Sequence, residues 1–164
     1  MQVLIIRHAI AVPRGTPDIP DDERPLTRAG EKRFRSAARG LARIADRPDA
    51  LLTSPLPRAA RTAELAAKAW GKVSPTDTPA LAGGELQDVM KAIEEHGADA
   101  TVAVVGHEPQ VSELLARLVG SGTADRLTFR KGGAALVEVQ GSLAEGGRLL
   151  WYLTPRILRE LAGD

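Results

Sequence analysis

The sequence predicts an α/β fold of three layers, an αβα sandwich in which helices cover a mostly parallel central sheet with an antiparallel edge strand. Short, nearly continuous apolar runs, typical of strands buried on both faces, alternate along the chain with segments of helical periodicity. Near the end of the chain, strand-like segments follow one another without an intervening helix, which favours an antiparallel edge. The length of 164 residues suits a single domain over 1–164.

The first half of the chain begins with the apolar run "QVLII" and continues through a segment with four prolines, a glycine and several acids, which predicts a loop. Thr27 is a suitable N-cap for the first helix, and Pro57 suits the first turn of the second. In order, the expected elements are a strand at 2–6, a loop at 11–25, a helix at about 28–45, a strand at 49–54 and a helix at 57–70.

The second half begins with a loop through Pro75 and Pro79, and Gly97 is a candidate C-cap for the helix that follows this loop. The expected elements are then a helix at 85–97, a strand at 101–106, a helix at 109–120, strand-like segments at 125–129, 133–140 and 148–154, and a closing helix at 155–163.

Composition excludes several classes of function. Lys and Arg number 22 against 21 Asp and Glu, and only 3% of residues are aromatic, so neither a basic stripe nor a base-stacking platform for nucleic acid is visible. No apolar run approaches the ~20 residues that a membrane span needs. The chain has no cysteine, which excludes disulfides and thiolate chemistry and fits a cytoplasmic protein. We expect no nucleic-acid and no membrane partner.

Basic side chains follow three of the predicted buried strands. Arg7 and His8 come directly after the first strand, and the second leads through "TSPLPR" to Arg58 at the start of a helix. The third strand ends at Gly106 and is followed by His107. Because ligands of such sheets bind beyond the carboxyl ends of the strands, these side chains are expected to converge on one site.

This set of side chains suits phosphoryl transfer. An arginine fork can bind two phosphate oxygens and keeps its charge at any working pH. A neutral imidazole, with an ordinary pKa of about 6.5, can attack phosphorus, and a second, protonated imidazole can hold the transferring group. The helix N-termini after Pro57 and Pro109 would point backbone N–H groups at the same anion.

The motifs "RHA", "SPLPRAARTAE" and "GHEP", in this order, resemble those of the histidine phosphatase superfamily, also called phosphoglycerate mutase-like. The segments "RPLTRAGE", "FRKGGAALVEV" and "LLWYLTP" look most like the SixA-type phosphohistidine phosphatases. The resemblance implies that His8 is the transiently phosphorylated nucleophile, that Arg7 and Arg58 bind phosphoryl oxygens, and that His107 stabilises the transferring group. It implies no cofactor and no metal. The family commonly has glycine where this chain has Ala9.

Each assignment has a structural alternative. A lone histidine at a strand end is more often a packing residue, and Arg58 could be a helix-surface charge. Arg61, three residues later on the same helix face, could line the pocket rim or only solvate the helix. The two histidines could instead bind a metal, but their arginine neighbours oppose a cation. His96 suits the last turn of a helix, and Lys131 with its glycine neighbours suits a turn.

The proton donor is open at this stage. Glu85, Asp21, Asp22 and Glu108 are the candidates, although the acids of the first loop could also be merely solvated. Because a phosphohistidine leaving group takes up its proton more readily than an alkoxide does, a weakly supplied acid favours P–N cleavage. Together with the SixA-like segments, this makes phosphohistidine on a signalling or phosphotransfer protein the predicted substrate. The alternatives are a small phosphorylated metabolite as substrate, or a phosphate-binding regulatory module without turnover.

Overall fold

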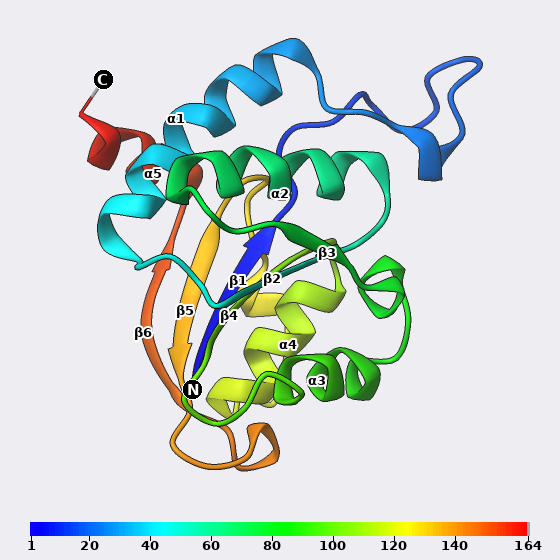
Figure 1. Cartoon of the computed structure of the whole chain (residues 1–164). Coiled ribbons are helices and arrows are strands. Elements are labelled where there is room, and N and C mark those ends of the chain that lie inside the picture. The colour runs from blue at the N-terminus through cyan, green and yellow to red at the C-terminus, as the bar shows by residue number, and fades with distance from the viewer. Residues whose placement is uncertain (164) are drawn as a thin grey trace.

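A six-stranded sheet runs through the centre of the computed structural model, which describes residues 1–163 (Figure 1). Its strand order is β3-β2-β4-β1-β5-β6, and the strands β3, β2, β4 and β1 are mutually parallel, whereas β5 and β6 pair antiparallel. The strands are β1 (Gln2–Arg7), β2 (Ala50–Thr53), β3 (Pro75–Asp77), β4 (Thr101–Gly106), β5 (Ala134–Glu138) and β6 (Arg148–Leu153).

Helices cover both faces of this sheet, as the sequence predicted. They are α1 (Arg28–Ile44), α2 (Pro57–Trp70), α3 (Leu86–Glu94), α4 (Gln110–Val119) and α5 (Pro155–Ala162). Leu4 and Ile6 of β1 pack with α1, α2 and α5, whereas Val3 and Ile5 pack with α3 and α4 on the opposite face. Because successive side chains of a strand point to opposite faces, a strand buried on both faces must be apolar throughout. The predicted fold class is confirmed.

Local signals explain where the helices begin and how closely they pack. The Thr27 hydroxyl accepts a hydrogen bond of 2.9 Å from the Gly30 amide, so Thr27 is the N-cap of α1, as predicted. Pro57 occupies the first position of α2. A Cβ on Gly40 would lie 1.7 Å from the carbonyl oxygen of Leu158, so the packing of α1 against α5 requires glycine at this position.

Two predictions about strands were wrong. The segment through Pro75, predicted as loop, forms the edge strand β3, where a proline at the first strand position costs no ladder hydrogen bond. The segment 125–129, predicted as a strand, instead contains the short 3₁₀ turn Asp125–Leu127. The amide of Phe129 donates to the Glu108 carboxylate at 2.6 Å, and the Phe129 ring is buried. These contacts fix the segment before β5 to the residues that directly follow β4.

Two boundaries also differ from the predictions. The helix predicted to reach Gly97 ends at Glu94, and Gly97 follows in a turn with a φ of +87°. The loop 11–25 is not wholly irregular, because it contains the 3₁₀ turn Asp21–Glu23 and ends in a bridge between Ala11 and Leu26. None of the helices within residues 1–163 is long and apolar enough to cross a membrane.

Candidate active site

His8 and His107 lie side by side at the carboxyl edge of the sheet. They follow Arg7 and Gly106, which are paired in the neighbouring parallel strands β1 and β4. Their ring centroids are 5.0 Å apart and the ring planes are inclined by 51°. The two histidines that lie 99 positions apart in the sequence therefore face one site.

The hydrogen bonding of His8 fixes which ring nitrogen can react. Nδ1 lies 2.7 Å from the carbonyl oxygen of Ala9, and because a carbonyl can only accept, Nδ1 carries the proton. Burial, together with the nearby charges of His107, Arg58 and Arg7, lowers the pKa of His8 to about 3. At neutral pH the ring is therefore neutral, and Nε2, which has no hydrogen-bond partner within the described residues, has a free lone pair.

His107 is held by its other neighbours. Its Nε2 lies 2.8 Å from the Ser54 hydroxyl, which accepts a hydrogen bond of 3.2 Å from the amide of Leu56 and can donate its own proton to Nε2, leaving the ring proton on Nδ1. Burial lowers the pKa of His107 to about 4, with a further contribution from Arg58. A bound phosphoryl group would oppose these effects, because an anion nearby favours the protonated imidazole.

Arg7 and Arg58 flank the histidines from β1 and from the first turn of α2. One Arg7 guanidinium nitrogen donates to the carbonyl of Phe129, and one of Arg58 donates to the carbonyl of Asp21 at 2.8 Å. Arg7 Nε, Arg58 Nε and His107 Nδ1 are buried and lack a partner within the described residues. Unpartnered buried donors are costly, and an anion bound among them would satisfy them.

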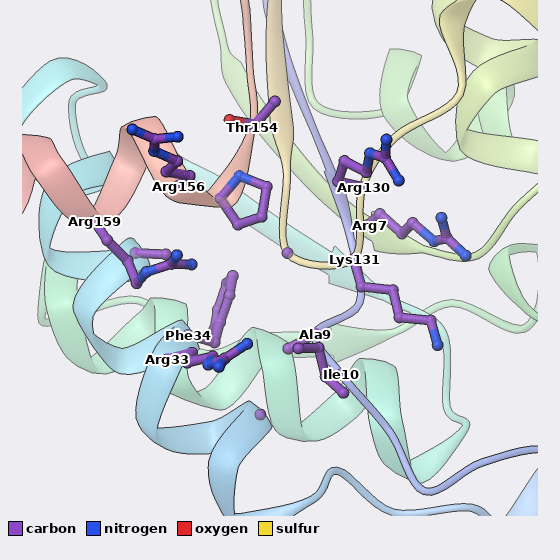
Figure 2. Close-up of a pocket in the computed structure, with 14 residues that line it drawn as sticks. Arg7, Ala9, Ile10, Arg33, Phe34, Arg130, Lys131, Thr154, Arg156 and Arg159 are labelled. Atoms are coloured by element: carbon purple, nitrogen blue, oxygen red, sulfur yellow. The ribbon is translucent and has the colours of Figure 1, made fainter.

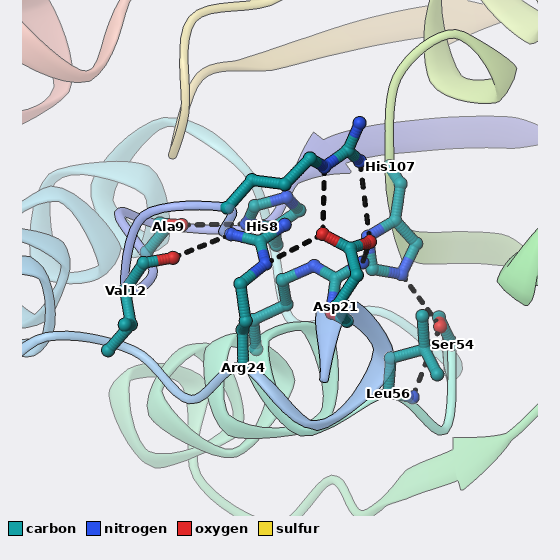
Figure 3. Close-up of polar contacts among 10 residues, drawn as sticks. His8, Ala9, Val12, Asp21, Arg24, Ser54, Leu56 and His107 are labelled. Carbon is teal, nitrogen blue, oxygen red and sulfur yellow. Dashed lines mark hydrogen bonds and ion pairs between the residues drawn. The ribbon is translucent and has the colours of Figure 1, made fainter. Parts of the chain in front are cut away.

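Arg24 is a further basic residue at this site that sequence analysis missed (Figure 3). It is only 6% exposed, its guanidinium donates to the Val12 carbonyl at 2.6 Å, and its positive charge contributes to the lowered pKa of His107. Asp21 lies among three arginines, with its carboxylate 2.7 Å from Arg14, 2.9 Å from Arg24 and 3.9 Å from Arg58. The loop 11–25 thus forms one wall of the site.

The sequence signal for Arg24 is its place in "RPLTRAGE", a segment that resembles SixA-type proteins. Arg24 does not follow a strand end. It reaches the site because the bridge between Ala11 and Leu26 closes the base of the loop. Ser54, which contacts His107, could have been found as the residue directly after β2.

Comparison with known proteins agrees with this geometry. The profile described as "Histidine phosphatase superfamily (branch 1)" matches residues 3–88. An uncharacterized protein of Picosynechococcus sp. (strain ATCC 27264 / PCC 7002 / PR-6) is 34% identical over 137 residues, which cover 81% of this chain and 82% of that protein. The chain belongs to the histidine phosphatase superfamily.

Solved structures place this member of the superfamily near SixA. The protein histidine phosphatase SixA complexed with tungstate superimposes with a TM-score of 0.82 at 28% identity, over 96% of this chain and 99% of that chain. A phosphoglycerate mutase from Bacillus anthracis, at 13% identity, gives a TM-score of 0.76 over 100% of this chain and 97% of that chain, and shows the shared fold. An alpha-ribazole phosphatase from Shigella flexneri, at 18% identity, gives a TM-score of 0.71 over 94% of this chain and 97% of that chain. The resemblance to the superfamily and to SixA is confirmed.

The structure brings the four predicted site residues of this chain together, but it separates the candidate proton donors. Asp21 and Asp22 lie near Arg58, and the hydrogen bond from Arg14 and the charge of Arg24 lower the pKa of Asp21. A carboxyl group with a lowered pKa is ionised at neutral pH and is a poor acid. The loop acid Asp21 is therefore not merely solvated.

The other two carboxylates have different environments. Glu85 is exposed at the start of α3, and its carboxylate makes no hydrogen bond or ion pair with any residue in 1–163. Glu108 lies near Arg7, but its carboxylate accepts hydrogen bonds from the Ser112 hydroxyl at 2.5 Å and from the Phe129 amide at 2.6 Å. Both oxygens of Glu108 thus hold the loop that follows β4.

The remaining predicted residues also have defined positions. Arg61 does not line the site, because its guanidinium lies 2.8 Å from Glu31 of α1 and 2.7 Å from Glu64 of α2. These acids raise the pKa of Arg61. His96 lies in the turn after α3. Lys131 lies in the turn before β5, where burial and the charge of Arg7 lower its pKa.

Residues 1–163 contain no group of three or more His, Asp or Glu side chains that could hold a metal ion. The charged neighbours of the two histidines are arginines. Superfamily members are phosphatases and mutases, so family membership indicates phosphoryl transfer as the class of reaction.

Proposed function

We propose that this chain is a phosphatase that hydrolyses phosphohistidine on a signalling or phosphotransfer protein, through a phosphohistidine intermediate on His8. The observation that carries the proposal is the arrangement of His8 and its neighbours. A neutral imidazole with a free Nε2 lies beside the unpartnered buried donors of Arg7, Arg58 and His107.

In the first step, Nε2 of His8 forms a bond to phosphorus while the P–N bond of the substrate breaks. The electron pair of that bond stays on the substrate nitrogen, and the leaving imidazole takes up a proton from solvent. Arg7 and Arg58 bind the phosphoryl oxygens, and their charges stabilise the transition state more than the ground state. The Nδ1–H bond to the Ala9 carbonyl keeps His8 in the tautomer that attacks.

In the second step, a water molecule attacks the phosphorus of phosphorylated His8 and loses a proton to solvent. The P–N bond to His8 breaks, inorganic phosphate leaves, and the neutral ring is restored. His107, once protonated beside the bound anion, donates a hydrogen bond to a phosphoryl oxygen in both steps. Its contact with Ser54 keeps the ring directed at the site.

The environment of the carboxylates favours phosphohistidine over a phosphomonoester. An alkoxide leaves poorly without an acid, whereas an imidazole accepts a proton from water near neutral pH. Asp21 is held ionised by arginines, Glu108 accepts two hydrogen bonds, and Glu85 is exposed. Each of these three carboxylates is thus either bound by neighbouring groups or exposed to solvent.

The test compares kcat/KM on a phosphohistidine-bearing protein domain with kcat/KM on a panel of metabolite phosphomonoesters. Wild-type protein, Glu85→Gln and Asp21→Asn are assayed on both. The proposal predicts that the P–N substrate is preferred and is the less sensitive of the two to loss of a carboxylate. A strong preference for one small monoester, lost on removal of a single acid, would contradict it and would identify the proton donor.

A further inference from the structure

A hollow of about 530 Å³ adjoins the active site on the side of α1 and α5 (Figure 2). Phe34, Pro155 and Ile10 supply apolar surface, and Ala9, the residue after the nucleophile, is also part of the wall. The hollow therefore begins one residue from His8. Of the residues that line it, only Arg7 takes part in the phosphoryl-transfer chemistry proposed above.

The charged residues of this hollow all have one sign. Six of the chain's 22 Lys and Arg line it, and no Asp or Glu does, although the whole chain has a formal charge of only +1. The residues are Arg7, Arg33, Arg130, Lys131, Arg156 and Arg159. Such a local excess of positive charge attracts anionic groups and steers their approach.

Most of these cations have no partner. Within residues 1–163, the side chains of Arg33, Arg130, Lys131 and Arg159 make no hydrogen bond or ion pair, whereas Arg156 pairs with Glu160 at 2.9 Å. By contrast, Arg35 of α1 and Arg61 of α2, which do not line the hollow, are paired with acids. Three arginines and one lysine without such a partner therefore line the hollow.

The hollow has two ends. Figure 2 shows Arg33 and Arg159 close to the Phe34 ring, whereas Arg7 and Lys131 are directed away from that ring. The Lys131 side chain extends on the same side as Arg7 (Figure 2), and burial and the charges of Arg7 and Arg24 lower its pKa. A ligand in the hollow could therefore continue into the active site past Lys131.

We propose that this hollow is the docking site for an acidic segment of the phosphorylated protein, in which one apolar side chain contacts Phe34 and flanking carboxylates pair with Arg33 and Arg159. This inference rests on the proposed function. The unpaired cations come from three separate elements and do not converge on one point, which fits a chain of spaced carboxylates better than one small anion. Binding there raises the effective concentration of the phosphohistidine at His8.

The test uses charge reversal far from the reacting atoms. Arg33→Glu, Arg159→Glu and the double variant are assayed on a phosphohistidine-bearing protein and on free phosphohistidine. Lys32→Glu, next to Arg33 on α1 but outside the hollow, is the matched control. We expect the double variant to lose about tenfold or more in kcat/KM on the protein, mainly through KM, because like charges now face the acidic segment. Activity on free phosphohistidine should change less than twofold in all variants.

A loss on the protein that Lys32→Glu matches, or an equal loss on both substrates, would overturn the docking site. So would an unchanged kcat/KM on the protein in the double variant. If wild type hydrolyses no phosphohistidine at all, the proposed function fails, and the docking site is judged by binding alone. A fluorescein-labelled Glu-Glu-Leu-Glu-Glu peptide should then bind wild type and Lys32→Glu alike and the double variant about tenfold more weakly. Equal affinities, or binding of citrate but not of the peptide, would contradict the docking site.

Discussion

His8 and His107 face one another with ring centroids 5.0 Å apart, because they follow paired residues of two adjacent parallel strands. Both rings are buried, and burial lowers both pKa values far below the ordinary value of 6.5. The unliganded protein therefore holds two neutral imidazoles at neutral pH. One can act as a nucleophile at once, whereas the other becomes a cationic donor only when an anion is bound beside it.

The first prediction is that anion binding takes up a proton at His107. Sulfate is a dianion throughout pH 5–7 and imitates the shape of phosphate, so a proton taken up on binding belongs to the protein. Calorimetric titration at pH 6 in buffers of different ionisation enthalpy should give an uptake of up to about one proton, because the bound dianion raises the pKa of His107.

The matched control for proton uptake is His107→Gln, which keeps a hydrogen-bond donor but cannot titrate. It should bind sulfate more weakly and with little proton uptake. The same uptake in this variant would assign the proton to another group, and no uptake in wild type would mean that His107 stays neutral.

The second prediction concerns stability against acid. In the unfolded chain His8 and His107 titrate near 6.5, whereas in the folded protein their pKa values lie at about 3 and about 4. At pH values between the folded and unfolded pKa values, the unfolded state binds more protons than the folded state does. The free energy of unfolding that these two neutral rings contribute is therefore fully present above pH 6.5 and is lost as pH falls. The expected slope is about 1.4 kcal/mol per pH unit for each histidine.

Urea unfolding from pH 7.5 to pH 4.5 measures this slope. His8→Asn should be less sensitive to acid over the interval from 6.5 to 4.5 than wild type. His96→Asn, in an exposed turn, provides the control and should retain the wild-type slope. An unchanged slope in His8→Asn would show that the ring is not held neutral in the folded protein.

The third prediction separates two arginines that lie one helical turn apart. Arg58 donates within the candidate site, whereas Arg61 joins α1 to α2 through Glu31. Arg58→Ala should lower kcat/KM by about two orders of magnitude, as expected for loss of a charge-assisted contact in the transition state. Arg61→Ala should change kcat/KM less than threefold and lower the free energy of unfolding by up to about 1 kcal/mol, since the pair is partly exposed.

Equal losses of activity in Arg58→Ala and Arg61→Ala, measured on the same phosphorylated substrate, would show that Arg58 has no special contact with the phosphoryl group. Denaturant unfolding of both variants distinguishes a catalytic loss from a general loss of structure.

Strand ends were the most predictable part of this molecule. The apolar runs that end at Ile6 and Val105 identify strands buried on both faces, and parallel strands in one sheet bring the next residues, including His8 and His107, to one edge. Such an inference needs only periodicity and topology. It does not need any side-chain contact.

Residues delivered by loops were less predictable. Arg24 reaches the site through a loop closed by a single bridge, and Asp21 acquires its partners only when that loop is in place. The edge strand that begins at Pro75 could not be predicted from the sequence, because a proline in so short a segment usually indicates a loop. The segment that ends at Phe129 resembles a strand in its sequence, but the amide of Phe129 donates to the Glu108 carboxylate, 21 positions earlier in the chain.

A rapid-quench experiment with a radiolabelled phosphohistidine-bearing protein and excess chelator tests most directly whether phosphate passes through His8 without a metal. Such a transfer requires acid-labile phosphate on the peptide that contains His8 within the first turnover, and neither this phosphate nor turnover in His8→Ala. Full turnover by His8→Ala, or activity abolished by the chelator and restored by zinc, would contradict it. Binding of phosphorylated proteins without phosphoenzyme or phosphate release on any of a broad panel would contradict it as well, and would assign this chain as a phosphate-binding module.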